Sequence, residues 1–297
     1  MNPNLNSLLE VSQADYSKLF STIEHGIVCK DIPPASIRLH FIRHFAGGLV
    51  PLNDLVETLI SYITHFCLAA ERRAGLGEQA RNKAFLEARK LFRKTNTSGQ
   101  PGELLVYFLL EAVLQAPQVL KKMLITTNPE LERNGSDGVH VRWAGDMLEL
   151  IFAEAKLHKS FGNALTQAFK SITDFHNSAT KGLEINFFLN TFNLLSSEQQ
   201  KIVKSYIEGE NKGKCSEVQV CLIGHTWDEY QCLKDRDKKD AFLKEFEARY
   251  LQWAETTMKP CLECELTTFT HSHLRFEFFF LPFTSVDDFR TLFLESL

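Results

Sequence analysis

The stretch from Gly135 to Lys156 reads GSDGVHVRWAGDMLELIFAEAK, and its pattern decides the fold. Over residues 139–143, valine and tryptophan alternate with histidine and arginine, which is typical of a strand with one buried face. Residues 144–146 (Ala-Gly-Asp) favour a turn, and residues 147–156 are apolar almost throughout, as in a strand buried on both faces. We therefore expect a hairpin whose second strand lies inside a sheet.

Three ionisable residues are expected at the end of this hairpin opposite the turn. Glu154 and Lys156 are two residues apart in a strand, so their side chains point to the same face. Asp137 precedes the first strand and lies at the same end, because the turn closes the other end. Two carboxylates on neighbouring strands can bind Mg²⁺ or Mn²⁺, and a lysine beside the metal can support hydrolysis of a phosphodiester.

The Glu-x-Lys pattern alone is a weak signal, since a strand can also end in an ion pair at the solvent edge. The same acid-x-Lys pattern occurs at Glu210-Asn211-Lys212 and at Asp237-Lys238-Lys239, in polar or charged segments. The context of Glu154 differs, because a long apolar strand precedes it and an Asp-Gly pair begins 17 residues upstream.

A buried helix is expected after the breaker Ser98–Gly102, because apolar residues run almost all round the sequence from Gly102 to Leu110. Glu103 stands in the first turn of this helix, where the helix dipole favours an acid. The dipole alone accounts for Glu103, but the order of the elements gives this residue a second interpretation.

That order is a helix with an early glutamate, a strand, a strand with Asp, a strand with Glu-x-Lys, and a helix, and it resembles the core of the PD-(D/E)xK nucleases. Over about residues 100–180 the segments resemble HamA, the nuclease subunit of Hachiman antiphage systems. The matching segments are Gly102–Leu105, Lys122–Thr127, Ser136–His140 and Phe152–Lys156. The resemblance implies an α/β (α+β) fold with a restriction-endonuclease-like core, in which helices flank a mixed central sheet.

The resemblance also implies roles for individual residues. Asp137 and Glu154 would be metal ligands, and the backbone carbonyl of Ala155 could add another ligand. Glu103 would complete or orient the metal site, and Lys156 would be the catalytic lysine. A first core strand is expected near Leu120–Thr127; which of its two lysines, Lys121 or Lys122, faces the site stays open.

Three regions are expected along the chain: an N-terminal accessory region over 1–98, the nuclease core over 99–226, and a helix–strand–helix unit packed on the core over 227–297. Further strands are predicted at Ile37–Phe45, Val218–Gly224 (the fourth core strand) and Leu274–Phe283, an aromatic strand expected in the core. Further helices are predicted at Asp54–Ala70, Asn82–Lys94, Phe161–Ala179, Ser197–Tyr206, Arg236–Ala254 and Val286–Leu297.

Basic residues concentrate in the predicted helix from Asn82 to Lys94, which is either a solvated face or a strip that contacts DNA phosphate. Gln167, on the exposed side of the next long helix, is either a contact near the scissile phosphate or an ordinary surface residue. The formal net charge of −4 indicates that the chain is not a self-sufficient DNA binder.

A helicase partner would account for this charge. In Hachiman systems HamA works with HamB, a superfamily 2 helicase, so the resemblance implies a heteromeric complex that acts on DNA. The chain has no Walker lysine loop, so ATP hydrolysis would come from the partner. The alternative function is a non-catalytic adaptor with a nuclease-like fold. The presence of Glu103, Asp137, Glu154 and Lys156 together favours the nuclease.

The cysteine content and the apolar runs favour a cytoplasmic protein that does not enter the membrane. No apolar run reaches the ~18 residues of a membrane helix, and no secretory signal is visible. Seven scattered cysteines fit a reducing compartment. Cys261 and Cys264, with His271 and His273 downstream, leave a zinc site open, although buried thiols are the favoured interpretation.

Overall fold

The structure is a computed structural model, and all structural statements concern the residues that it describes. These are residues 5–29, 33–42, 44–45, 48–49, 52–68, 73, 75–93, 95, 98–120, 135–178, 181–182, 197–207, 214–233, 239–271 and 273–297. Lys121 and Lys122 of the predicted first core strand lie outside them, as do Glu210, Lys212 and most of the loop around them.

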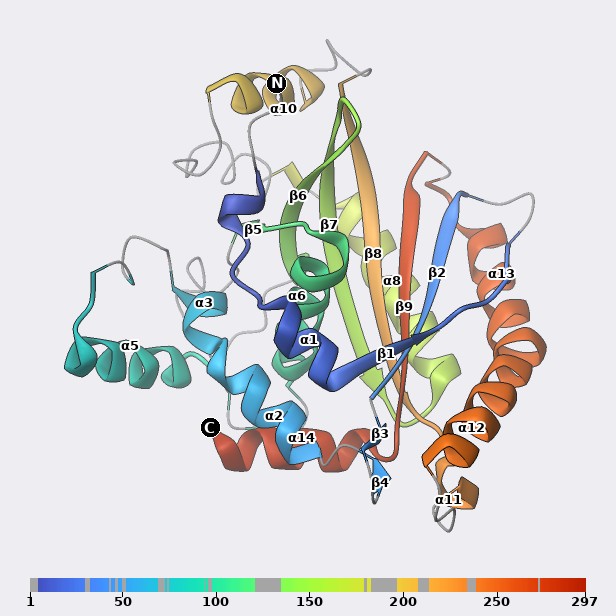
Figure 1. The fold of residues 1–297 in the computed structure, drawn as a ribbon. Helices are drawn as coiled ribbons and strands as arrows, with labels where there is room; N and C mark the ends of the chain where they lie inside the picture. Colours follow the sequence, from blue (N-terminus) through green and yellow to red (C-terminus); the bar gives the residue numbers. More distant parts are fainter. Residues whose placement is uncertain are drawn as a thin grey trace.

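A seven-stranded mixed sheet runs through the molecule in the order β1-β2-β9-β8-β7-β6-β5 (Figure 1). Neighbours among β2, β9, β8 and β7 are parallel, whereas β1, β6 and β5 pair antiparallel with their neighbours. This confirms the expected α/β class with a mixed central sheet. The strands are β1 Phe20–Ile23, β2 Ala35–Ile42, β5 Gln118–Leu120, β6 Gly138–Ala144, β7 Met147–His158, β8 Cys215–Thr226 and β9 Arg275–Phe283; β3 His44–Phe45 and β4 Gly48–Leu49 form a separate pair.

The predicted hairpin forms β6 and β7. The two strands are in register from Gly138 opposite Ala153 to Ala144 opposite Met147. Gly145 has a φ of +62° at the first position of the two-residue loop, the position where type II′ hairpin turns require glycine. β7 is continuously buried from residue 148 to residue 155, because β6 and β8 flank it and helices cover both faces of the sheet.

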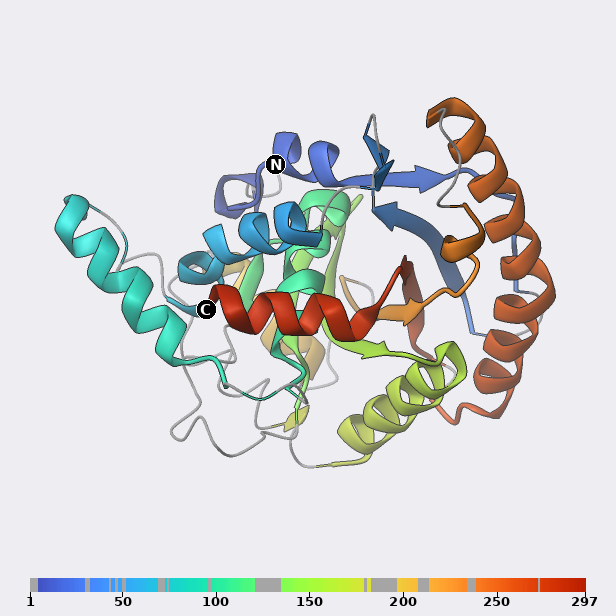
Figure 2. The ribbon, with the colours of Figure 1, turned by 90° about the horizontal axis from the view of Figure 1, so that it is seen from below.

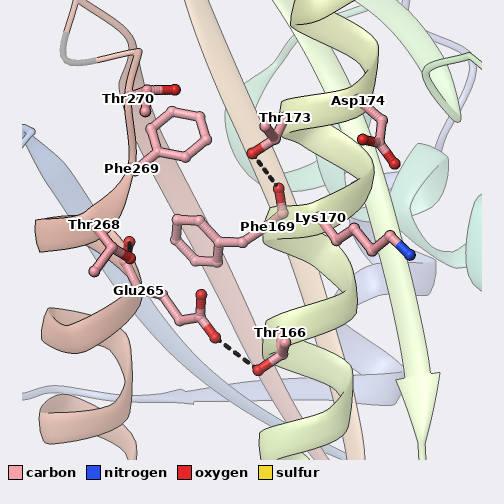
Figure 3. Close-up of a pocket in the computed structure, with 9 residues that line it drawn as sticks. All are labelled: Thr166, Phe169, Lys170, Thr173, Asp174, Glu265, Thr268, Phe269 and Thr270. Atoms are coloured by element: carbon pink, nitrogen blue, oxygen red, sulfur yellow. Dashed lines mark hydrogen bonds between the residues drawn. The ribbon is translucent and has the colours of Figure 1, made fainter.

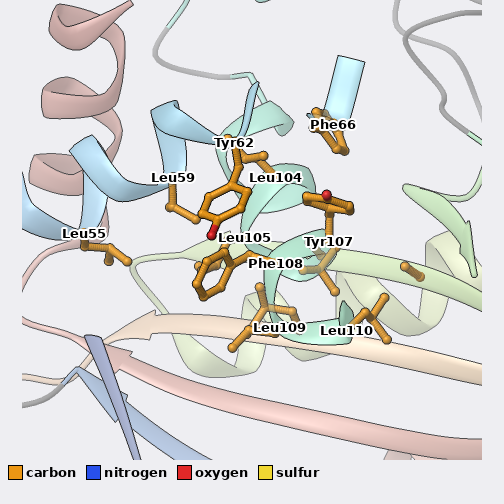
Figure 4. Packing of buried hydrophobic residues seen from close by; sticks show 14 of the residues in the cluster. Leu55, Leu59, Tyr62, Phe66, Leu104, Leu105, Tyr107, Phe108, Leu109 and Leu110 are labelled. Carbon is orange, nitrogen blue, oxygen red and sulfur yellow. The ribbon is translucent and has the colours of Figure 1, made fainter. Parts of the chain in front are cut away.

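One layer of helices covers the sheet face to which Ala153 and Ala155 point. Its central helix, α6, is buried almost all round, as predicted. Figure 4 shows how α2 and Tyr62 pack on this helix, with the rings of Tyr62 and Phe108 5.4 Å apart. The layer contains α1 Gln13–Leu19, α2 Leu52–Ser61, α3 Ile63–Cys67, α6 Gln100–Leu114 and α14 Val286–Ser296, and α5 Glu78–Lys90 projects from its edge (Figures 1 and 2).

The helix predicted from Asp54 to Ala70 is two helices, α2 and α3, because the chain breaks at Tyr62. The Tyr62 hydroxyl accepts a hydrogen bond from the Ser12 amide at 3.0 Å and donates one to Asp15 at 2.8 Å. The basic helix, α5, begins four residues earlier than predicted and ends at Lys90.

The second layer covers the opposite face (Figure 2). α8 buries the apolar side that the sequence predicts, including Leu165 and Phe169. The predicted aromatic strand, β9, is buried, with Phe276 and Phe278 packed under this layer. The layer contains α8 Phe161–Asn177, α11 Tyr230–Leu233, α12 Lys239–Trp253 and α13 Lys259–Thr268; a π-helical turn, η2 Ala254–Met258, joins α12 and α13 into one long helix. α10 Ser197–Ile207 and the short η1 Leu5–Leu8 flank the sheet near β7 and β8 and near β6 respectively.

The sheet draws strands from all three regions expected from the sequence. β1 and β2 come from the first region, β5 to β8 from the second, and β9 from the third. β9 lies between β2 and β8, where Phe279 is opposite Arg38 on one side and Leu222 on the other. The outer regions therefore extend the same sheet that carries the hairpin.

Charged side chains tie four strands together on the face that α6 covers. Arg142 of β6 donates from Nε to Glu149 of β7 at 2.6 Å and from Nη2 to Glu277 of β9 at 2.8 Å. Arg275 pairs with both carboxylates, and Arg38 of β2 pairs with Glu277. Both glutamates are almost fully buried, so this network replaces the water that their carboxylates lose on folding.

Within the described ranges, no helix is both long enough and apolar enough to cross a membrane.

Candidate functional site

Glu154 and Lys156 lie toward the carboxyl end of β7 and form an ion pair. Lys156 Nζ is 2.6 Å from Glu154 Oε1; the glutamate side chain is 7% exposed and the lysine side chain 24% exposed. Cys221 of β8 is the strand neighbour of Glu154. Burial raises the pKa of the Cys221 thiol, Glu154 raises it further and Lys156 lowers it. Cys221 is fully buried beneath the pair, and Lys156 is the more exposed of the two paired side chains.

Asp137 is fixed beside this pair by the end of the β6–β7 ladder. Its amide donates to the carbonyl of Ala153 at 2.8 Å, and its Oδ2 accepts from the amide of Ala155 at 2.8 Å. The carboxylate thus replaces a strand carbonyl at the point where β6 begins. Asp137 directly precedes Gly138, which is opposite Ala153, and it binds β7 on both sides of Glu154, at Ala153 and at Ala155. The structure brings Asp137, Glu154 and Lys156 to one end of the hairpin, as the sequence pattern predicts.

The carbonyl of Ala155 is directed to the same edge. In a strand the N–H and C=O of one residue point to the same neighbouring strand. The amide of Ala155 points to Asp137, so its carbonyl points past the start of β6 as well. Two carboxylates and a carbonyl are hard oxygen donors, the set that suits Mg²⁺, an ion that also keeps several waters.

Glu103 approaches from the other side of β7. A Cβ on Gly102 would lie 3.3 Å from side-chain carbons of Ala155 and Leu157, so α6 packs directly on these two residues. Ala155 and Leu157 alternate along the strand with Glu154 and Lys156, which point to the opposite face. Glu103 is buried in the first turn of α6, and its Oε1 lies 3.7 Å from where a Cβ on Gly99 would be.

No group of three or more His, Cys, Asp or Glu side chains is arranged to hold a metal ion in the part of the chain that the structure describes. Glu103 is therefore not gathered with Asp137 and Glu154 into a three-carboxylate cluster, and its part in the site stays a prediction.

The same finding bears on the zinc site left open by the sequence. Cys261, Cys264, His271 and His273 all belong to the described residues, and they form no such group. Cys264 is exposed and Cys261 half-buried on α13, so the expectation of buried thiols is also wrong for this pair. An amphipathic helix can place both at its surface, which a Cys-x-x-Cys pattern alone does not reveal.

Three further polar residues gather where β7 ends. His158 is two residues beyond Lys156 on the same face, and the side chain of Gln167 on α8 forms a hydrogen bond with it. Burial lowers the pKa of His158, and the nearby cations Arg290 and Lys156 lower it further. Gln167 therefore lies beside the predicted site. No local pattern indicates His158 or Arg290, because α14 and β7 are far apart in the chain.

A groove lies elsewhere, between α8 and α13 (Figure 3). It encloses about 290 Å³, and Thr166 Oγ1 donates to Glu265 Oε1 across it at 2.6 Å. It is lined by Thr166, Phe169, Lys170, Thr173 and Asp174 from α8 and by Glu265, Thr268, Phe269 and Thr270 from α13 and the residues after it. None of the predicted site residues lines this groove.

Comparisons with known proteins add one match. A family model described as HamA matches residues 17–297, which span the whole sheet and every residue of the site. No curated protein matches the chain.

Proposed function

This chain belongs to the HamA family, and from that premise we propose that it is a metal-dependent DNA nuclease of antiphage defence that acts with a superfamily 2 helicase in the cytoplasm. The observation that supports the proposal best is the meeting of Asp137, Glu154 and Lys156 at one end of the β6–β7 hairpin. This end coincides with the carboxyl ends of the parallel strands, where open α/β sheets bind their ligands.

The residues suit phosphodiester hydrolysis. Asp137 and Glu154 would hold Mg²⁺ or Mn²⁺ with the carbonyl of Ala155, and a bound metal supplies polarisation of the phosphate and a water of lowered pKa. The backbone bond from Ala155 holds the Asp137 carboxylate in place before any ligand arrives, so little reorganisation is needed. Lys156, partly exposed beside Glu154, can donate to a phosphate oxygen and offset its negative charge.

A partner that supplies DNA fits the charge of the chain. Phosphate contacts provide most non-specific affinity for DNA, and the formal net charge is −4. We therefore expect the isolated protein to bind duplex DNA weakly near physiological salt. In complex with the helicase it should bind tightly and cut when ATP is turned over or when DNA ends are engaged.

The test of the reaction is metal dependence. Purified protein, together with its helicase partner, is incubated with plasmid and linear DNA in Mg²⁺, in Mn²⁺ or in EDTA. Cutting is expected with either metal and not with the chelator. Equal cutting in all three conditions would rule out the proposed chemistry, whereas a folded complex that cuts in none of them would favour the adaptor function.

A pair of substitutions tests the residues. Glu154→Ala and Lys156→Ala should abolish cutting and leave the thermal midpoint near that of the wild type, because groups held for chemistry often cost stability. Lys259→Ala and Glu263→Ala serve as the matched control, since these residues form a partly exposed pair on α13, 4.0 Å apart. A folded and fully active variant at position 154 or 156 would remove that residue from the mechanism.

A further inference from the structure

The guanidinium of Arg290 on α14 is half-buried beside the end of β7 without a carboxylate partner among the described residues. Its Nη2 donates to the carbonyl of Leu157 at 2.8 Å, while its Nε is buried and has no hydrogen-bond partner there. Burial lowers the pKa of Arg290, and only Asp287, one turn earlier on the same helix and exposed, acts in the other direction. One donor of this cation is thus left without an acceptor.

Such an arrangement costs stability. A buried donor without an acceptor loses its water and gains nothing in return, and a partly buried cation without an anion is penalised further. Arg142 of the sheet network shows the usual solution, because it is bonded to two buried carboxylates. Arg290 lacks this solution at a position where strand carboxyl ends face a potential ligand.

The groups beside Arg290 add hydrogen-bond donors rather than charge, because the pKa of His158 is lowered and Gln167 is uncharged. His158 ends β7 and is hydrogen bonded to Gln167, and the cations that act on His158 are Arg290 and Lys156. Lys156 is paired with Glu154, so that carboxylate is already engaged. Arg290 thus reaches the carboxyl end of β7 from α14, beside His158 and its partner Gln167 on α8.

We propose that Arg290, His158 and Gln167 form a binding site for a DNA backbone phosphate adjacent to the one that is cut, an inference that rests on the proposed function. A phosphate would accept charge-assisted hydrogen bonds from the N–H groups of the guanidinium that do not bind Leu157. Lys156 and His158 are two residues apart on one strand face, a separation of about 7 Å. One nucleotide of extended backbone spans such a distance, so neighbouring phosphates would lie along β7.

DNA binding without cutting tests this site. Full-length protein carrying Glu154→Ala is titrated with a fluorescein-labelled duplex at low salt, with and without Arg290→Gln, and anisotropy is followed over a series of salt concentrations. We expect Arg290→Gln to weaken binding about 3- to 10-fold and to reduce the slope of log affinity against log salt by about one, the effect of one lost phosphate contact. Arg249→Gln is the control, because Arg249 on α12 pairs with Glu229 and Glu245.

His158→Gln provides a second variant that leaves the bond from Arg290 to Leu157 intact, and it should weaken binding in the same direction by a smaller factor. Inorganic phosphate provides a second measurement. It should raise the thermal midpoint of the wild type, relative to sodium chloride of equal ionic strength, and should not do so for Arg290→Gln.

Unchanged affinity and salt slope in both variants, or equal stabilisation by phosphate with and without Arg290, would overturn the inference. These outcomes are separate from those of the metal experiment. Binding that depends on Arg290 in a protein that never cuts would retain the phosphate site and reject the nuclease. Metal-dependent cutting by the wild type, together with Arg290 variants that bind DNA as tightly as the wild type, would retain the nuclease and reject the phosphate site.

Discussion

Exchanging Asp137 for asparagine should separate its structural contribution from its chemical one. The Asp137 carboxylate accepts the amide of Ala155 at 2.8 Å in a buried position, so it serves the sheet as well as any metal. An asparagine side chain keeps a carbonyl oxygen that can accept the same hydrogen bond but loses the negative charge. Alanine removes both.

The two substitutions therefore differ in expected cost. Asp137→Ala leaves a buried amide without a partner, which destabilises by about 1–3 kcal/mol. Asp137→Asn replaces a charge-assisted bond with a neutral one of about half the strength and should cost less than about 1 kcal/mol. Loss of a residue that only hydrogen bonds to a metal ligand typically lowers activity ~10- to 100-fold. Because Asp137 is proposed as a ligand itself, both substitutions should lower the cutting rate by more than this.

Urea denaturation measures the free energy of unfolding of each variant, and plasmid cutting with the helicase partner measures activity. An asparagine variant as unstable as the alanine variant would show that the bond to Ala155 is not what holds this residue. An asparagine variant that cuts at the wild-type rate would refute the assignment of Asp137 as a ligand.

Three other predictions concern stability, pH and the partner. Glu277→Ala leaves the buried sheet network without one of its carboxylates and should lower the free energy of unfolding, measured in urea, by about 3–5 kcal/mol; a loss under ~1 kcal/mol would contradict this. Burial lowers the pKa of His40 from 6.5 to about 4, so between these pH values the unfolded chain binds the proton and the folded chain does not. The free energy of unfolding should therefore fall by about 1.4 kcal/mol for each pH unit below 6.5, down to about pH 4. His40→Leu should remove this contribution from the measured pH dependence of stability. The triple charge reversal Arg89→Glu, Lys90→Glu and Arg93→Glu, in α5 and the residues just after it, should weaken either DNA binding or co-purification with the helicase. If both interactions survive the reversal, this basic stretch is only a solvated face.

Local pattern was enough to predict the parts of the site that lie within one hairpin. Alternation with period two fixes which side chains share a face, so the pairing of Glu154 with Lys156 followed from their spacing. The glycine at position 145 marked the turn and hence the register that places Gly138 opposite Ala153 and brings Asp137 to the same end of the hairpin as Glu154. These features depend on residues close together in sequence.

Other features depend on contacts between distant segments, and no local pattern encodes them. Tyr62, at the break between α2 and α3, is hydrogen bonded to residues near the N-terminus of the chain, whereas the helical periodicity runs on through it. The place of β9 at the middle of the sheet, and the contact of Arg290 with Leu157, arise only when the third region packs on the first two. The side from which Glu103 approaches likewise depends on how α6 crosses β7.

The position of β9 also sets an order of events during synthesis. β2 and β8 both leave the ribosome before their common neighbour, so each presents an unpaired edge until residues 275–283 have been made. Pairing of Arg38 with Phe279 closes a very long loop, which slows folding more than it weakens the final state. α14 follows β9, and Arg290 arrives with it. A nascent chain therefore lacks a finished sheet until residues 275–283 have been made, and it lacks the contact of Arg290 with Leu157 until α14 follows.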